Sequence, residues 1–145
     1  DLERRRDVER AAVRAAFFNG EGLYLSGDVT LFSPACLALI RQTHALLHAH
    51  AEAFTSLDPA PLVPTLNQAV HANRFPAPRS VVWTFLHTGA APFTGPALRV
   101  PHRAGARYLD AWNGRALAPE ITRDGYAIIA LTLGAGDAGC VVQSW

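Results

Sequence analysis

The sequence contains no lysine and no methionine, so all 13 basic residues of the 145-residue chain are arginines. A Schiff-base enzyme, a lysine general base and a phosphate-binding loop each need a lysine, and these chemistries are therefore excluded for this chain. The first residue is Asp1 and not methionine. This favours a processed chain or a piece of a longer one.

The chain also has little excess charge. It has 13 arginines and 12 acidic residues, which gives a net charge of +1, and half of its residues are hydrophobic. Nucleic acids are bound by concentrated positive charge, so no nucleic-acid partner is expected. The apolar runs are far shorter than the roughly 20 residues that cross a bilayer, and the N-terminus is charged, so no membrane partner is expected either.

Cysteine is scarce. Cys36 and Cys140 would form one disulfide in an oxidising compartment, but two buried thiols are the commoner outcome at this separation. The sequence leaves the localisation open.

The first 60 residues have a mainly helical pattern. Charges spaced three or four residues apart over residues 1–10 predict a solvated helix face. The apolar run Ala15–Asn19 is interpreted as a short buried strand that ends at the Asn19-Gly20 turn. A second helix is predicted over Pro34–Phe54, with the Ser33 hydroxyl as its N-cap and a proline in its first turn.

Three prolines between Asp58 and Pro64 end this helix and place a domain boundary there, between residues 1–60 and 61–145. Beyond it the apolar period changes to two, and turn signals such as Asn113-Gly114 recur, as in an antiparallel sandwich. The predicted fold class is therefore α+β: N-terminal helices with one short strand, followed by an antiparallel β-sandwich.

Two motifs suggest cofactors but lack the necessary context. Residues 134–139 match G-x-G-x-x-G, but too few residues follow them to form the helix that a dinucleotide needs, so a glycine-rich hairpin is expected. His44 and His48 have a spacing that suits zinc, but Ala45 stands where a zincin has glutamate, and His50 falls near the opposite margin of the apolar face. Histidines at the boundary of an amphipathic helix are expected, with no metal and no cofactor.

Two further groups of residues are candidates for a carbohydrate site. Glu21 and Asp28 follow the predicted strand and are either a carboxylate pair of the kind used in glycoside hydrolysis or solvated loop acids. Trp83, Tyr108 and Trp112 either stack on sugar rings or form part of the sandwich core, and the core interpretation is favoured. No catalytic residue is identified.

The chain resembles a known family in the stretches AAFFNGEG, VPTL, LRVPH, GARYLDAWNG and APE. Their order is similar to that in the C-terminal part of glycoside-hydrolase-like bacterial proteins. In these a (β/α)8 barrel is followed by an all-β sandwich and, in some, by a formylglycine-generating-enzyme-like domain. The resemblance covers most of the chain and is strongest over residues 14–22 and 99–114. Its motifs are packing and turn motifs.

The resemblance implies that residues 1–60 are the end of an α/β barrel. In that case Ala15–Asn19 is the last barrel strand, Pro34–Phe54 is the last barrel helix, and Asn19, Glu21 and Asp28 contact substrate at the barrel mouth. Residues 61–145 are then an accessory sandwich that stabilises the barrel or assists carbohydrate binding. Because a barrel has eight such units in about 250 residues, the chain alone is not expected to be catalytic.

The alternative function is a stand-alone sandwich module that binds carbohydrate or another partner. In either case the first 60 residues have an apolar face that lacks its barrel neighbours. The chain is therefore expected to bind the missing barrel portion, to self-associate, or to pack its helix against its own sandwich.

Overall fold

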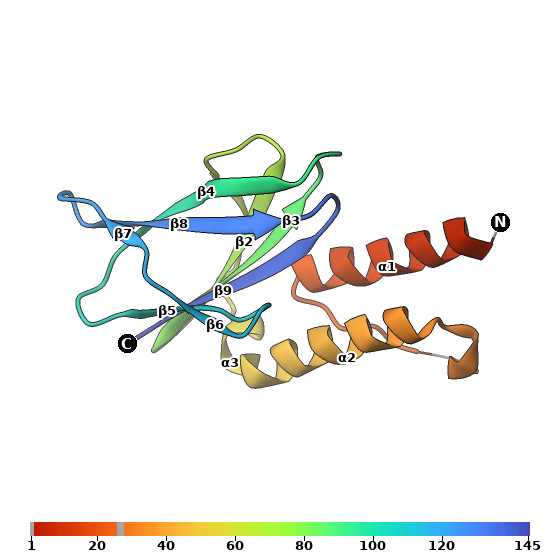
Figure 1. The fold of residues 1–145 in the computed structure, drawn as a ribbon. Coiled ribbons are helices and arrows are strands. Elements are labelled where there is room, and N and C mark those ends of the chain that lie inside the picture. Colours follow the sequence, from red (N-terminus) through yellow and green to blue (C-terminus); the bar gives the residue numbers. More distant parts are fainter. Residues whose placement is uncertain (1, 26–27) are drawn as a thin grey trace.

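The computed structural model describes residues 2–25 and 28–145. The helices precede all the strands described (Figure 1). They are α1 (Leu2–Phe18), the 3-10 helix η1 (Val29–Leu31), α2 (Pro34–Ala49) and α3 (Ala51–Phe54). The strands are β1 (Ala60–Val63), β2 (Val70–Ala77), β3 (Ser80–His87), β4 (Phe93–Pro101), β5 (Arg107–Asp110), β6 (Arg115–Leu117), β7 (Glu120–Ile121), β8 (Tyr126–Leu133) and β9 (Ala138–Ser144).

The strands form two sheets in which every pair is antiparallel. Sheet A has the order β1-β2-β3-β9-β5-β6, and sheet B has the order β4-β8-β7. The main core lies between the sheets and includes Trp83, Phe85, Leu98 and Ile129. The predicted α+β fold with an antiparallel sandwich is confirmed.

The helices pack on the face of sheet A that points away from sheet B, so the molecule has three layers (Figure 1). A second core cluster joins Phe17 of α1 and Ala53 of α3 to Val82 and Val142 of the sheet. Packing of the helices against the sandwich is one of the outcomes expected above. None of the helices in residues 2–25 and 28–145 is both long enough and apolar enough to cross a membrane.

The strand predicted over Ala15–Asn19 is wrong, because these residues form the last turn of α1 and its C-cap. Val13 and Phe17, four residues apart, are both buried, which is helical spacing. Gly20 ends the helix with a φ of +75°. The Gly20 N–H donates to the Phe17 carbonyl and the Glu21 N–H to the Ala16 carbonyl, the Schellman pattern. Asn-Gly is thus a helix stop here.

The helix predicted over Pro34–Phe54 is confirmed, with a break at His50 between α2 and α3. The Ser33 hydroxyl accepts a hydrogen bond from the Cys36 N–H at 3.2 Å, as expected of an N-cap. The buried side chains of α2 include Cys36 and Ile40, which pack against Val13 of α1.

The sandwich follows the period-two pattern closely. In β3, Trp83 and Phe85 face sheet B, whereas Val82 packs in the helix-facing cluster. Asn113 and Gly114 are the last two residues of the four-residue β5–β6 turn. Residues 134–137 join β8 to β9, and there the Asp137 carboxylate accepts a hydrogen bond from the Gly134 N–H at 2.9 Å. The predicted glycine-rich hairpin is wrong, because β8 belongs to sheet B and β9 to sheet A, so this turn carries the chain from one sheet to the other.

Candidate functional site

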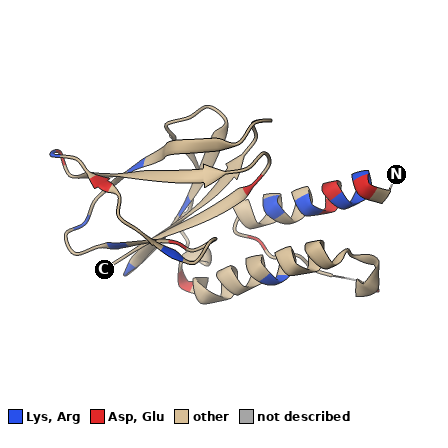
Figure 2. Cartoon of the chain, viewed as in Figure 1, with Lys and Arg blue, Asp and Glu red and all other residues tan. Residues whose placement is uncertain are grey.

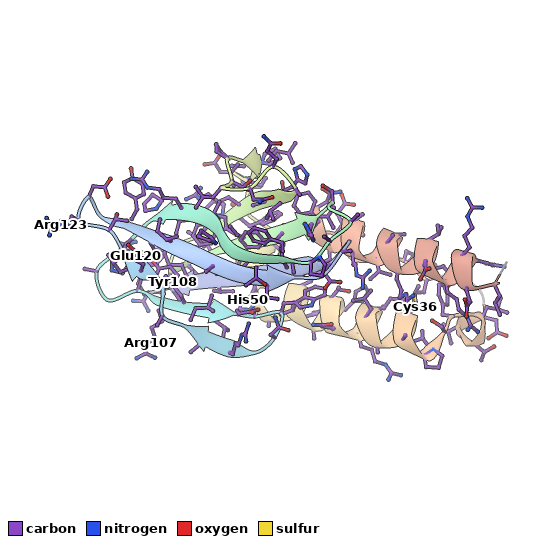
Figure 3. The ribbon with its side chains drawn as sticks, turned by 45° about the horizontal axis from the view of Figure 1, so that its top comes forward. Cys36, His50, Arg107, Tyr108, Glu120 and Arg123 are labelled. Carbon is purple, nitrogen blue, oxygen red and sulfur yellow. The ribbon has the colours of Figure 1, made fainter. Side chains whose placement is uncertain are left out.

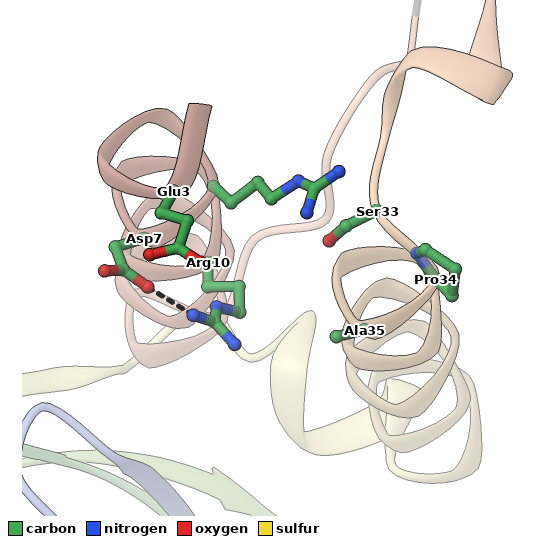
Figure 4. A pocket seen from close by; sticks show the side chains of 7 residues that line it. Glu3, Asp7, Arg10, Ser33, Pro34 and Ala35 are labelled. Atoms are coloured by element: carbon green, nitrogen blue, oxygen red, sulfur yellow. Dashed lines mark hydrogen bonds and ion pairs between the residues drawn. The ribbon is translucent and has the colours of Figure 1, made fainter. Parts of the chain in front are cut away.

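The two long helices run in the same direction. At one end, Glu3, Asp7 and Arg10 of α1 face Ser33 and Ala35 at the start of α2, across an open hollow of about 600 Å³ (Figure 4). At the other end, where the helices meet the sheet, the ring of Phe17 lies 5.8 Å from that of Phe54 in α3. The chain must therefore run back between α1 and α2 (Figure 1).

The returning segment, Glu21–Leu25, is extended and apolar on both sides. Leu23 and Leu25 are partly buried against the α1–α2 cluster, whereas Tyr24 between them is 94% exposed. The Leu23 N–H donates to His44 Nε2 at 3.1 Å. No backbone hydrogen bond joins residues 22–25 to any other residue that the structure describes. The segment has the pattern of a strand covered on both faces, but it has no neighbouring strand.

The two candidate acids lie at opposite ends of this segment. Asp28 caps η1, where its Oδ1 accepts hydrogen bonds from the Thr30 hydroxyl at 2.7 Å and the Thr30 N–H at 2.9 Å. These bonds lower the pKa of the exposed Asp28 carboxyl. Glu21 follows the C-cap residue Asn19 at the sheet end of α1, and both are exposed. The ends of this 17-residue helix are about 25 Å apart, so the structure does not bring Glu21 and Asp28 together.

The three candidate stacking aromatics are in packed positions. Trp83 and Tyr108 are 3% and 5% exposed, in the core between the sheets, and neither offers an open ring face. Figure 3 shows Tyr108 within the sandwich. Trp112 is half-buried with its ring 5.3 Å from Phe17, and its carbonyl accepts a hydrogen bond from Gln42 of α2. These rings hold the layers together, which is the core interpretation.

The helix histidines have separate environments. The Nε2 atom of His44 is engaged as the acceptor from Leu23, and His48 is exposed. His50 is the C-cap of α2, and burial lowers its pKa. Within residues 2–25 and 28–145, no three His, Cys, Asp or Glu side chains are grouped closely enough to hold a metal ion.

The two cysteines are free and buried, as favoured above. Cys36 lies between α1 and α2 (Figure 3), and Cys140 lies between sheet A and the helices. Burial raises the pKa of the Cys140 thiol from 9.0 to about 12.

This shift predicts a loss of stability in alkali. Above pH 9 the unfolded state loses the Cys140 proton while the folded state keeps it, so the free energy of unfolding falls until about pH 12. The loss from one such group is about 1.4 kcal/mol per pH unit. Urea unfolding at pH 8.5 and 10.5 measures it, with Cys140→Ala as the comparison. An equal loss in both proteins contradicts the assignment to Cys140.

The sequence analysis missed two polar residues that join the layers. The Phe18 carbonyl, at the end of α1, accepts hydrogen bonds from Asn73 Nδ2 at 2.9 Å and from the Thr84 hydroxyl at 2.6 Å. Both side chains are buried and project from the helix-facing side of sheet A. A polar residue inside an apolar strand, as in VVWTFLH, is the signal that could have identified Thr84.

Comparison with known proteins supports the fold. No family model and no curated protein matches the chain. Three similar solved structures are a candidate alpha-galactosidase from Bacteroides fragilis (TM-score 0.63, 6% identity, 94% of this chain), an Anoxybacillus alpha-amylase (0.62, 9%, 94%) and a candidate alpha-N-acetylgalactosaminidase from Bacillus halodurans (0.60, 10%, 97%).

The chain spans only 28–32% of the length of these three structures. At such low identity the likeness shows a shared arrangement of helices and sheets. It agrees with the resemblance to part of a glycoside-hydrolase-like protein.

Proposed function

We propose that this chain is the C-terminal segment of a glycoside-hydrolase-like protein. In this proposal α1, the Glu21–Leu25 segment and α2 are the last helix, strand and helix of an α/β barrel. Barrel helices are parallel to one another and antiparallel to the strands between them, and the segment has this arrangement. The observation that carries the proposal is the unpaired segment with Leu23 and Leu25 on one side and Tyr24 on the other.

The same arrangement assigns different roles to the candidate polar residues. Catalytic groups of barrels lie at the carboxyl ends of the strands, and Asp28 follows that end of the segment. Asp28 is therefore the residue that we assign to substrate contact at the mouth. Asn19 and Glu21 lie at the other end, beside the sandwich, where barrels use residues for stability.

The sandwich, in this proposal, supports the barrel. It anchors the end of α1 through Phe17 and the Phe18 carbonyl, and it receives α3 on the same face of sheet A. Because Trp83 and Tyr108 are enclosed, their rings give no support to sugar stacking.

The test compares this chain with the longer protein that the proposal implies, expressed together with the residues encoded upstream of Asp1. Tyr24→Ser is expected to leave the unfolding of the chain alone unchanged, because the ring is exposed there. In the longer protein, neighbouring barrel elements would cover the ring, and the same change is expected to cost about 1.5–3 kcal/mol. Denaturant unfolding of both proteins measures the difference.

Leu57→Ser is the matched control, because Leu57 is fully exposed and lies outside the segment. It is expected to be neutral in both proteins. An equal effect of Tyr24→Ser in both, or an upstream sequence without repeated strand–helix units, contradicts the proposal. Asp28→Asn, assayed on aryl glycosides in the longer protein, tests the assignment of Asp28, and unchanged hydrolysis contradicts it.

A further inference from the structure

A second hollow, of about 200 Å³, lies on the sandwich at the inner face of sheet A. Strands β2, β3 and β9 provide its floor, and the residues at the end of β4 and just after it provide one wall. The lining side chains that matter here are Arg74, Trp83, His102, Arg103, Gln143 and Trp145. None of them belongs to the barrel-like segment, so the inference does not depend on the proposed function.

The hollow is positively charged. Two arginines and a histidine line it, and no side-chain carboxylate does so among the described residues. The surrounding region has the same bias, because residues 61–145 contain seven arginines and four acids, whereas residues 1–60 contain six arginines and eight acids. Figure 2 shows basic segments on the strands and loops at the end of the sandwich far from the helices, with a few acidic segments among them.

Arg74 is a half-buried cation without a partner. It lies beside Trp83 in the β2–β3 pairing, on the inner face of sheet A. Other arginines, such as Arg99 with Asp124 and Arg115 with Asp110, form ion pairs. Within residues 2–25 and 28–145, Arg74 has no ion pair and no side-chain hydrogen bond. Its guanidinium donors are therefore available to a ligand.

Arg103 is held in place by an aromatic ring. Its guanidinium carbon lies 4.3 Å from the centre of the Trp145 ring. Stacking on a ring fixes the plane of a guanidinium and leaves the N–H donors at its edge free to bind two oxygens at once. Carboxylate, sulfate and phosphate match this donor geometry.

The other polar side chains of the hollow, Gln143 and His102, belong to a chain of hydrogen bonds. Gln143 Nε2 donates to the Pro101 carbonyl at 3.1 Å and to Tyr108 Oη at 2.7 Å. The Tyr108 hydroxyl in turn lies within hydrogen-bond distance of His102 Nδ1, 2.9 Å away. This chain of contacts holds the His102 ring in place at the wall of the hollow.

We propose that this hollow is a binding site for an oxyanion group of a small ligand, with Arg74 and Arg103 as its charged donors. The hollow is smaller than the 300–1,000 Å³ that is usual for small-molecule pockets. It therefore suits one anionic group, or one acidic sugar ring. A carboxylate on a sugar and a phosphate share the required chemistry, and the experiment separates them.

The experiment is an NMR titration at constant ionic strength that follows the indole signals of Trp83 and Trp145. The probes are glucuronate, inorganic phosphate and neutral glucose. Saturable shifts are expected with at least one anion and none with glucose. Binding of glucuronate alone identifies a carboxylated sugar as the ligand class, and binding of phosphate alone identifies a phosphorylated ligand.

Arg74→Gln and Arg103→Gln are each expected to raise the Kd about 10–100-fold, the effect of losing a charged hydrogen-bond partner. Arg103 is exposed, so its variant keeps the test decisive if Arg74→Gln does not fold. Arg41→Gln is the control, because it removes the same charge from an exposed arginine on α2. Its Kd is expected to stay within twofold of that of the unchanged protein. Absence of saturable binding by both anions, or equal weakening by Arg41→Gln, overturns the proposal.

Discussion

Replacing Phe17 with alanine is expected to lower the free energy of unfolding by about 3–5 kcal/mol, the range for a large aromatic removed from a core. Phe17 is fully buried, and its ring lies 5.8 Å from Phe54 and 5.3 Å from Trp112. These contacts join α1 to α3 and to the β5–β6 hairpin. The cavity that the Phe17→Ala substitution leaves would therefore lie where the helices meet sheet A.

Urea unfolding followed by circular dichroism measures this loss. Phe93→Ala is the matched control, because the Phe93 ring is only partly buried at the edge of the main core. The control is expected to cost clearly less than Phe17→Ala. A loss below about 1 kcal/mol for Phe17→Ala would mean that the helix layer contributes little to the stability of the sandwich.

The double change Asn73→Leu with Thr84→Val is expected to cost about 2–5 kcal/mol. It removes both donors to the Phe18 carbonyl, and it removes Asn73 Oδ1, which accepts from the Leu62 N–H at 2.7 Å. Each buried polar group left without a partner costs about 1–3 kcal/mol. The Leu62 bond also supports a strained residue, since Leu62 has a φ of +50°.

The measurement is a double-mutant cycle of unfolding free energies. Each single change leaves the Phe18 carbonyl one donor, so the double change is expected to cost more than the sum of the two. Thr132→Val is the control, because its exposed hydroxyl contacts only the Thr94 hydroxyl in the described part of the chain. Strict additivity would contradict a shared role of Asn73 and Thr84 at the Phe18 carbonyl.

Local signals predicted much of the fold. The Ser33 cap, the turn at Asn113-Gly114 and the alternation of β3 act over a few residues, and the structure has all three. The free cysteines were also predicted correctly. The glycine-rich hairpin was not, because a turn signal does not show that the strands on either side of it belong to different sheets. The separation of Glu21 from Asp28 was not predicted, because it depends on the path of the Glu21–Leu25 segment between α1 and α2, which no local pattern determines.

The sequence by itself determined the element types wherever one pattern extended over many residues. It did not separate helix from strand over Ala15–Phe18, because a short apolar run is compatible with both. In the structure these residues are helical, and Phe17 is buried between α3 and sheet A. Only the tertiary structure decided which atoms meet across 55 and 66 residues at the Phe18 carbonyl, and that the half-buried Arg74 has no ion pair in the described part of the chain. The spacing of apolar residues in the sequence shows which side chains share a face of a helix or strand. Which other element covers that face is decided only by tertiary packing.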